Sequence, residues 1–441
     1  MRLCRNAGRD VALVALVAML GISVVACSSS SKSSSGSKTT SGGSNNSSAS
    51  AQFSKPSGTV RGFDGTTIKV ASLGIKGQLP GVEFGASGRV KRFNDTNEIP
   101  GVKLQYVEFA DDKNDRATAL SEARRLVAQQ QAFAIVGDTS AFNPLAYFQQ
   151  QKVPYFGWGF DGTYCSPQPS TSLWGFGMNG CLIPDNPTAM PDGASSLYKY
   201  VAQKTGKQHP TVALFGGDVP SGNKAVTTSA VDWKGAGFDV VFAKGIIPGP
   251  APVSDYTPYV QQLLTSNHGN PPDAMTCLAA TDCIPMYKGL TGNNYGGIFI
   301  SPLYSDLLLS AMKGSVVFTM FAPNDQPTPA NKQVLSDIKS VKADQTLDLG
   351  AAAGYFTTDM FIQALKKVVD ANGKAYISPD NVQKAAANMT WQIKGLMGPT
   401  KYPESTVRST PACSAVVVDD GTQWKTVVPY SCSYKTWPVN G

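Results

Sequence analysis

The chain has 441 residues, of which 42% are hydrophobic and 9% aromatic, so it is long enough for two separate cores and has a globular composition. Its formal net charge of +7 suggests a basic protein, but the first 55 residues hold six basic side chains and one acidic one. Only about +2 is left for the rest, which lacks a Lys/Arg cluster interleaved with aromatic residues. These features argue against a nucleic-acid-binding protein.

The first 26 residues have the pattern of a secretion signal. Three arginines precede an uncharged apolar run, Val11 to Val25, which is short for a membrane span. The run ends in Val-Val-Ala before Cys27, which resembles the bacterial lipobox, where cleavage leaves a lipid-modified cysteine as the first residue. We therefore expect residues 1–26 to be removed and Cys27 to anchor the protein on the extracytoplasmic face of the cell membrane. The alternative, a cysteine ending a transmembrane helix, is disfavoured because serines follow at once.

Residues 27–62 are predicted to form a lipidated tether. From Ser28 to about Gln52 the chain is almost entirely Ser, Gly, Thr, Asn, Ala and Lys, which provide almost no apolar surface to bury. Such a segment holds a folded part at a distance from a membrane without joining its core. The folded part is therefore expected to begin near residue 63.

Strand and helix patterns alternate after the tether, which predicts βαβ units and a parallel sheet. The strands of this first lobe are predicted at Thr67–Leu73, Val102–Phe109, Phe133–Gly137 and Val153–Trp158. Its helices are predicted at Phe84–Asn94 and at Pro144–Gln150. Between them, another helix is predicted to begin after Asp115, which is a plausible N-cap. A loop rich in Gly, Pro and Ser follows, from Gly159 to about Pro191.

A second alternating series predicts a second lobe. Its strands are expected at Thr211–Phe215, Phe238–Lys244, Asp273–Cys277, Gly297–Ile300 and Val316–Phe321. Helical stripes are formed by Val226, Ala230 and Trp233, by Ala330–Lys342, and by Phe361, Leu365 and Val368. A closing hairpin is predicted at Ala415–Asp419 and Trp424–Val428, around Asp420-Gly421.

Six cysteines remain in the folded part, and an even number favours disulfides in an exported chain. Each of three local pairs would close a short loop beside turn residues, so we predict Cys165–Cys181, Cys277–Cys283 and Cys413–Cys432. A metal site is disfavoured, because no spacing is C-x-x-C and both histidines lie elsewhere in the sequence. We expect no cofactor.

Several short motifs follow one another in a characteristic order along the folded part. They are Gly81–Asn97, Pro100–Leu104, Asp111-Asp112, Ile135–Gly137 with Ser140, Val153–Phe156 and Gly395–Pro399. In this order the chain resembles the type I periplasmic binding proteins, specifically the branched-chain amino acid (Leu/Ile/Val) receptor family of ABC importers. The resemblance implies two discontinuous α/β lobes with parallel-type sheets, joined by three crossing segments, and a ligand cleft between them. It places lobe 1 at 63–185 and 325–398, and lobe 2 at 186–324 and 399–441.

The resemblance also implies ligand contacts in lobe 1. Ser140, with Thr139 beside it, follows a strand where the family uses a serine hydroxyl and backbone N–H groups to hold a ligand carboxylate. The alternative for Ser140 is a helix N-cap. Gly159, Phe160 and Asp161 match a second contact segment, where amino-acid receptors usually carry small residues and a Thr or Ser. The ring of Phe160 points instead to an apolar or aromatic ligand.

Further contacts are implied in lobe 2. The matching positions are Ser221, Thr281 and Leu303. Leu303 departs from the family, which commonly has an acidic residue there to pair with a ligand ammonium, so an α-amino acid is in doubt unless Asp161 or Asp306 supplies the charge. Phe84 and Trp158 are predicted to wall the ligand, with core packing as the alternative reading.

The sequence therefore predicts a monomeric extracytoplasmic lipoprotein that captures a small polar or amphipathic solute, such as an amino acid or a related carboxylate or amide. It would deliver this solute to an ABC permease. An enzyme is disfavoured, because the chain has no G-x-S-x-G or H-E-x-x-H motif, and its G-x-G-x-x-G at Gly157 to Gly162 does not open a helix. The alternative left open is a ligand-sensing or structural envelope lipoprotein of the same fold, not coupled to a permease.

Overall fold

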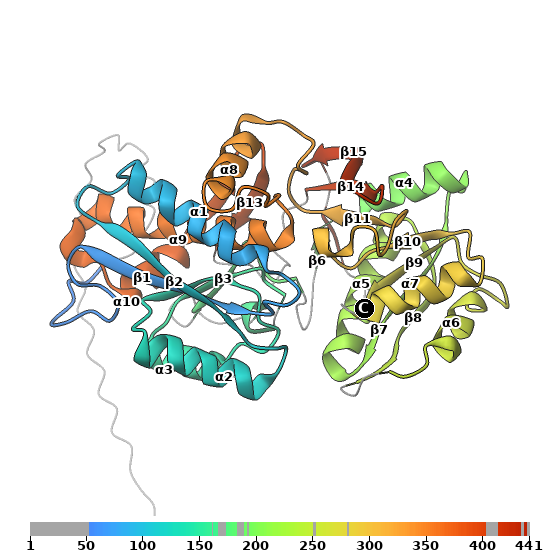
Figure 1. Cartoon of the computed structure of the whole chain (residues 1–441), viewed down its shortest axis with the longest axis horizontal. Coiled ribbons are helices and arrows are strands. Elements are labelled where there is room, and N and C mark those ends of the chain that lie inside the picture. Colours follow the sequence, from blue (N-terminus) through green and yellow to red (C-terminus); the bar gives the residue numbers. More distant parts are fainter. Residues whose placement is uncertain are drawn as a thin grey trace, which may run out of the picture. The chain divides into compact units, whose positions relative to one another are not determined.

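Two β-sheets with helices packed on them form the described part of the chain, which confirms the predicted α/β class (Figure 1). The computed structural model describes residues 53–160, 162–165, 173–182, 189–191, 194–249, 253–279, 282–402, 413–433 and 436–438. Ala51–Gly441 is a unit of its own by its internal contacts. The predicted signal, Cys27 and most of the tether lie outside the described residues.

The first sheet has five strands in the order β2-β1-β3-β4-β5, and all of its pairs are parallel. Its strands are β1 (Thr67–Gly74), β2 (Lys103–Asp111), β3 (Ala134–Asp138), β4 (Tyr155–Gly157) and β5 (Gly175–Gly177). Val70 and Val136 pack into one buried cluster, whereas Ala71 and Ile135 pack into another. Successive side chains of a strand point to opposite faces, so this sheet is buried on both sides.

The helices of lobe 1 come from both halves of the sequence. They are α1 (Gly81–Asp95), α2 (Arg116–Arg124) with the π-helix η1 (Arg125–Gln129), α3 (Leu145–Gln151), α8 (Pro329–Lys339), α9 (Leu349–Asn372) and α10 (Pro379–Ala386). The blue α1 packs directly on the orange α9 (Figure 1). Their backbones approach so closely that a Cβ at Gly85 would lie 2.0 Å from the Ala351 carbonyl oxygen. Glycine is therefore required at this crossing.

The second sheet has seven strands in the order β15-β14-β11-β10-β9-β7-β8. They are β7 (Thr211–Asp218), β8 (Asp239–Pro248), β9 (Ala274–Leu278), β10 (Ile298–Ile300), β11 (Val316–Thr319), β14 (Ser414–Asp419) and β15 (Trp424–Ser431). The helices of this lobe are α4 (Ser195–Thr205), α5 (Pro220–Ala236), α6 (Thr257–Leu264), α7 (Cys283–Gly292) and the short η4 (Asp306–Leu308). The strands from β8 to β11 are parallel, and β14 and β15 form the predicted antiparallel hairpin.

The chain passes between the two sheets three times, as the fold prediction required. It leaves the first sheet after β5, returns between β11 and α8, and leaves again between β13 and β14. The remaining elements are β6 (Ala189–Pro191), β12 (Thr390–Ile393), β13 (Met397–Lys401), β16 (Thr436–Pro438), the 3-10 helix η2 (Gly162–Cys165) and η5 (Lys374–Tyr376). The stretch predicted as a loop from Gly159 to Pro191 thus contains β5, β6 and η2. The boundaries between the tether and the two lobes remain predictions.

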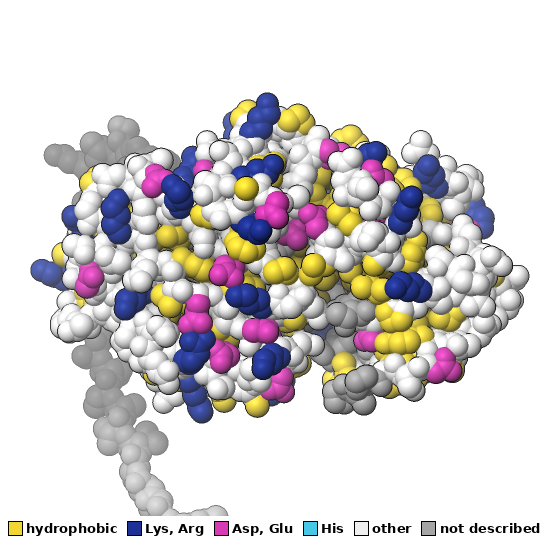
Figure 2. Space-filling view, in the orientation of Figure 1, with side chains coloured by type: hydrophobic (Ala, Val, Ile, Leu, Met, Phe, Trp, Pro, Cys, Tyr) yellow, Lys and Arg dark blue, Asp and Glu magenta, His cyan; other side chains and the backbone are white. Residues whose placement is uncertain are grey.

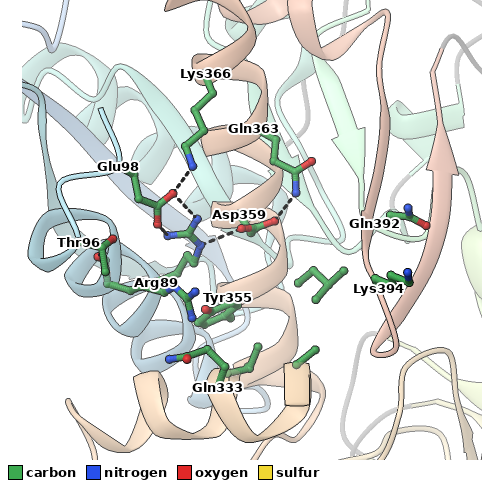
Figure 3. A pocket seen from close by; sticks show the side chains of 14 residues that line it. Arg89, Thr96, Glu98, Gln333, Tyr355, Asp359, Gln363, Lys366, Gln392 and Lys394 are labelled. Atoms are coloured by element: carbon green, nitrogen blue, oxygen red, sulfur yellow. Dashed lines mark hydrogen bonds and ion pairs between the residues drawn. The ribbon is translucent and has the colours of Figure 1, made fainter. Parts of the chain in front are cut away.

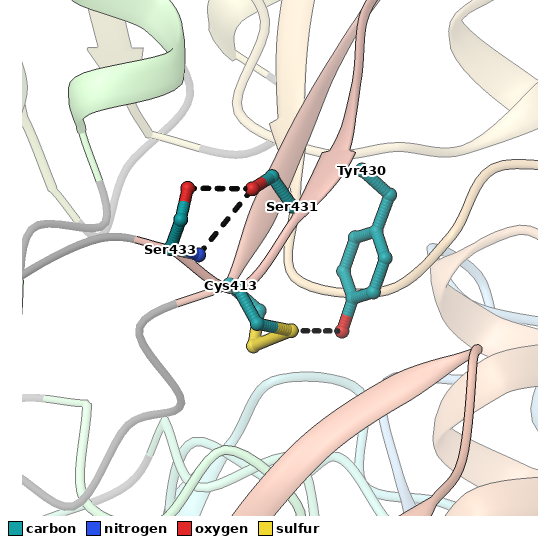
Figure 4. The surroundings of a disulfide bond; sticks show 5 residues. Cys413, Tyr430, Ser431 and Ser433 are labelled. Carbon is teal, nitrogen blue, oxygen red and sulfur yellow. Dashed lines mark hydrogen bonds between the residues drawn. A yellow bond between two sulfur atoms is a disulfide. The ribbon is translucent and has the colours of Figure 1, made fainter.

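All three predicted disulfide pairs are present. They are Cys165–Cys181 between η2 and the loop after β5, Cys277–Cys283 between β9 and α7, and Cys413–Cys432 across the β14–β15 hairpin. Figure 4 shows the last pair, where the Tyr430 hydroxyl lies 3.6 Å from Cys432 Sγ and the hydroxyls of Ser431 and Ser433 hydrogen-bond each other at 2.8 Å.

Surface charge, the apolar character of the helices and the grouping of metal-ligating side chains are informative about the class of protein. On the face drawn in Figure 2, Lys and Arg side chains are interspersed with Asp and Glu rather than gathered in one basic patch. Within the described ranges, no helix combines the length and the apolar character needed to cross a bilayer. The same residues contain no group of three or more His, Cys, Asp or Glu side chains placed to hold a metal ion.

Candidate ligand site

A cavity of about 170 Å³ lies at the carboxyl ends of strands from both sheets. In lobe 1 its lining includes Trp158, which follows β4, and Asn179, which closely follows β5. In lobe 2 it includes Leu278 at the end of β9 and Ser301 directly after β10. Parallel strands bring the loops at their carboxyl ends to one edge of the sheet, which is where such sheets usually bind ligands. Both lobes therefore contribute to one partly open cavity.

Aromatic side chains make up much of the cavity wall. They are Trp158, Phe160, Trp233, Tyr304, Phe318 and Phe321. The rings of Trp158 and Phe160 are stacked, with centroids 5.2 Å apart and planes 15° from parallel. Gly159 between them has φ +92°, and a Cβ there would lie 2.1 Å from the Gly180 carbonyl oxygen. Only glycine fits this turn, which sets the two flanking rings side by side.

A few polar side chains complete the lining. They are Asn179, Ser229, Asp232, Thr276, Ser301 and Thr319. Asp232 is 8% exposed and is the one charged residue among the described residues that line the cavity. Asn179 is 2% exposed, and its Nδ2 donates to the Trp158 carbonyl oxygen at 3.4 Å. Its Oδ1 accepts no hydrogen bond from any residue that the structure describes.

Helix α5 explains why Asp232 reaches the cavity. Ala225, Ser229 and Asp232 are spaced by four and three residues, so they share one helical face, and all three line the cavity. Val226 and Ala230 lie on the neighbouring face and pack into the buried cluster of lobe 2. Sequence reasoning found only this second, apolar stripe and missed Asp232. The small and polar stripe beside it was the available signal.

The structure brings together part of the predicted ligand-binding set. Trp158 and Phe160 line the cavity, and Gly159 connects them. Gly159 itself is not part of the lining, and neither are the predicted residues Phe84, Thr139, Ser140 and Leu303. Phe84 and Leu303 are half-buried and pack against the main core. Ser221 lies in the first turn of α5 with its side chain outside the described part, and Asp161 and Thr281 are not described. The ligand roles of all these residues remain predictions.

Ser140 lies at the end of β3 beside two buried aspartates. Its backbone N–H donates to Asp138 Oδ1 at 3.1 Å, and its hydroxyl accepts from the Phe142 N–H at 3.1 Å and hydrogen-bonds Asp112. Burial raises the pKa of Asp112 above its ordinary value. The neighbouring Thr139 Oγ1 is buried without a partner in the described part of the chain. An anionic group held here would face Asp112 and Asp138, so this edge favours a neutral or cationic group.

A larger hollow of about 670 Å³ lies on lobe 1 alone, between α1, α8, α9 and β12 (Figure 3). Arg89, Glu98, Asp359 and Lys366 in its lining are paired with one another. Arg89 donates to Glu98 at 2.7 Å and to Asp359 at 2.8 Å, and Lys366 also bonds Glu98. Burial lowers the pKa of Arg89, but Asp359 and Glu98 outweigh it and hold this pKa above its ordinary value. The network joins α1 to α9, so we assign it to the stability of lobe 1.

Two discontinuous α/β lobes that share one small cavity define a two-lobed solute-binding protein. The family model described as "Periplasmic binding protein" matches residues 76–422, and the chain belongs to this family. This agrees with the resemblance to type I periplasmic binding proteins found in the sequence. No curated protein matches the chain.

Solved structures share the fold at low sequence identity. A fatty acid ABC transporter substrate-binding protein from Thermomonospora curvata has a TM-score of 0.65 and 15% identity, covering 85% of this chain and 94% of its own. A solute-binding protein from Rhodopseudomonas palustris HaA2 in complex with p-hydroxybenzoic acid has a TM-score of 0.62 and 17% identity, covering 84% and 98%. A branched-chain amino acid ABC transporter protein from Thermus thermophilus with bound valine has a TM-score of 0.60 and 14% identity, covering 83% and 96%.

Proposed function

We propose that this chain is an extracytoplasmic lipoprotein, anchored through Cys27, that captures a small amphipathic solute and delivers it to an ABC importer as a monomer. The observation that carries the proposal is the cavity lined by strand ends of both lobes. A solute there touches both lobes at once, so its binding energy favours a closed arrangement of the lobes. A permease has to distinguish the closed, loaded form from the empty protein.

The substrate-binding proteins of similar fold support the transport part of this proposal. Their described ligands are a fatty acid, p-hydroxybenzoic acid and valine, so one fold serves several apolar and aromatic solutes. The lipoprotein part is supported by the apolar run that ends at Cys27 and by the Ser-rich segment after it. Membrane attachment keeps the binding protein close to its permease, which raises its effective concentration there.

The proposal is tested by a binding screen on the unit Ala51–Gly441. Native mass spectrometry against amino acids, amines, amides and small carboxylates identifies ligands, and calorimetry measures their affinity. Phe160→Ala is expected to weaken the best ligand at least tenfold, because it removes a ring from the cavity wall. Leu307→Ala is the matched control, since Leu307 is 53% exposed and lies outside the lining. Equal affinity of the two variants would contradict the assigned site.

Transport is then separated from sensing in cells. Deletion of the gene is expected to abolish uptake of the identified solute, and the intact gene is expected to restore it. Unchanged uptake in the deletion strain, with binding intact in vitro, would replace the transport role by the ligand-sensing alternative.

A further inference from the structure

The cavity at the strand ends has the size of one small ring. Its volume of about 170 Å³ is close to the roughly 150 Å³ of an engineered apolar cavity that binds benzene. The part of a ligand that lies in it is therefore a single ring or a branched aliphatic group of similar size. The stacked rings of Trp158 and Phe160 offer such a group an apolar wall.

Asn179, a polar side chain of the lining, has an unused hydrogen-bonding atom. It is 2% exposed, and its Nδ2 donates to the Trp158 carbonyl oxygen at 3.4 Å. A carbonyl oxygen can only accept, so this bond orients the amide with Nδ2 toward Trp158. Asn179 Oδ1 is then buried without a donor from any residue that the structure describes. A buried acceptor without a donor costs free energy, which a ligand O–H or N–H in the cavity removes.

The turn that carries Asn179 is held against the segment that carries the two stacked rings. Before Asn179, the Met178 N–H donates to the Gly157 carbonyl oxygen at 2.8 Å. After it, the Leu182 N–H donates to the Gly159 carbonyl oxygen at 3.1 Å. The acceptor and the aromatic wall therefore keep a fixed spacing before a ligand arrives, which lowers the entropic cost of binding.

The other polar side chains of the lining discriminate less between ligand groups. A hydroxyl can both donate and accept, so it adapts to a ligand of either kind. The lining hydroxyls that the structure describes on Ser and Thr belong to Ser229, Thr276, Ser301 and Thr319. Asp232 already takes part in an interaction within the protein, so no ligand charge is assigned to it. Asn179 is therefore the residue through which a ligand with a donor is distinguished from one without.

From these contacts we propose that the cavity selects a ring-sized solute that bears an O–H or N–H group, and that Asn179 determines this specificity. The solute donates to Asn179 Oδ1, while Trp158 and Phe160 cover its ring. Phenols, aromatic amines and cyclic amides belong to this class, and rings without a donor do not. This inference rests on the proposed solute-binding function and specifies its solute class.

The test compares two probes of nearly equal size, phenol and fluorobenzene, of which only phenol carries a donor. Fluorobenzene is the more apolar probe, so burial of apolar surface alone would favour it. Calorimetry on Ala51–Gly441 is expected to give phenol an affinity at least tenfold above that of fluorobenzene, because only phenol satisfies Asn179. Asn179→Leu keeps the size of the side chain without the acceptor and should reduce this preference to less than threefold. Asn372→Leu makes the same change at the exposed last residue of α9, outside the lining, and should preserve the preference.

Three results overturn the assignment to Asn179. They are fluorobenzene affinity equal to or above that of phenol, an unchanged preference in Asn179→Leu, and no binding of either probe. If the broader screen still finds a solute, only this inference fails, and if the screen finds none, solute capture fails with it. If Asn179→Leu does not fold by circular dichroism, Asn179→Ala replaces it with the same expected loss of preference. The comparison of the two probes on the wild type needs no variant and by itself can overturn the inference.

Discussion

Asp348 caps helix α9 from a buried position. Its side chain is 3% exposed and accepts a hydrogen bond from the Ala351 N–H at 2.9 Å. Burial raises the pKa of Asp348 to about 7, and the nearby carboxylate of Asp306 contributes to the rise. Burial also raises the pKa of Asp306 itself. The cap therefore binds a proton more tightly in the folded protein than in the unfolded chain.

This shift predicts a loss of stability as pH rises. Since the folded pKa lies above the unfolded value, the contribution of Asp348 is largest at low pH and is lost as pH rises toward about 7. Asp348→Asn keeps a good N-cap but does not titrate. Between pH 5 and pH 8 the variant should gain stability relative to the wild type, on the order of 2 to 3 kcal/mol. Urea unfolding of Ala51–Gly441 at both pH values measures this difference.

Asp115 provides the matched control for the buried cap. It caps α2, its carboxylate accepts from the Thr118 N–H at 2.8 Å, and that hydrogen bond lowers the pKa of Asp115. Neither aspartate nor asparagine changes its charge at this cap above pH 5. The stability of Asp115→Asn relative to the wild type should therefore show no comparable change between pH 5 and pH 8. A similar pH dependence in both variants would rule out burial of Asp348 as its cause.

The sequence predicted some of the residues that line the cavity and missed others for a physical reason. Trp158 and Phe160 were predicted because Trp158 ends a recognisable strand and Phe160 follows it in a segment that resembles a contact segment of the family, so local order along the chain is enough to place them. Asp232 and Asn179 were missed because their place in the lining depends on which face of α5, and which turn after β5, meets the other lobe. That information is in the packing of distant segments, which a local pattern does not contain.

At the scale of elements, the three disulfides differ in the length of the loop that each one closes. The sequence separations are 16 residues for Cys165–Cys181, 6 for Cys277–Cys283 and 19 for Cys413–Cys432. Loop entropy in the unfolded chain gives about 3 kcal/mol for the two longer loops and about 2 kcal/mol for the short one. Replacing a pair by two alanines should therefore lower the free energy of unfolding more for Cys165/Cys181 and Cys413/Cys432 than for Cys277/Cys283.

Urea unfolding of the three double variants checks the order, and the variants are matched because each loses two sulfur atoms. If the Cys277/Cys283 variant were the least stable, the short disulfide would stabilise the native loop between β9 and α7 rather than constrain the unfolded chain.

Strongly patterned elements were predicted, whereas several weakly patterned short ones were not. The cap at Asp115 and the β14–β15 hairpin have local signatures, and both are present. β5 has only three residues, Gly-Phe-Gly, and its strand conformation comes from pairing with β4 rather than from propensity. The β12–β13 pair and α10 were also not predicted, since they are short and their sequences, TWQI, MGPTK and PDNVQKAA, lack the run of apolar residues that marks the short strands of the two sheets.

At the scale of the whole molecule, Cys27 is predicted to decide where the protein resides. Cys27→Ser should eliminate lipid modification, because only the thiol accepts the acyl glyceride of a lipobox. Mass spectrometry of the N-terminal peptide from a membrane fraction measures the acyl mass directly. Cys4→Ser is the matched control, since Cys4 lies within the predicted signal and should leave the lipid mass unchanged. An unmodified Cys27 in the wild type would remove the anchor from the proposed function.

The packing of α1 on α9 also joins segments that are far apart in the sequence. A ribosome makes the first strands of lobe 1 early, but the helix that covers α1 begins only at Leu349. Until then α1 and β3 lack the partner that buries them, while every parallel strand of lobe 2 has already been made. Contacts between such distant segments form slowly because a long loop has to close first. The first half of lobe 1 therefore cannot complete its core until α9, which follows all parallel strands of lobe 2 in the sequence, packs on it.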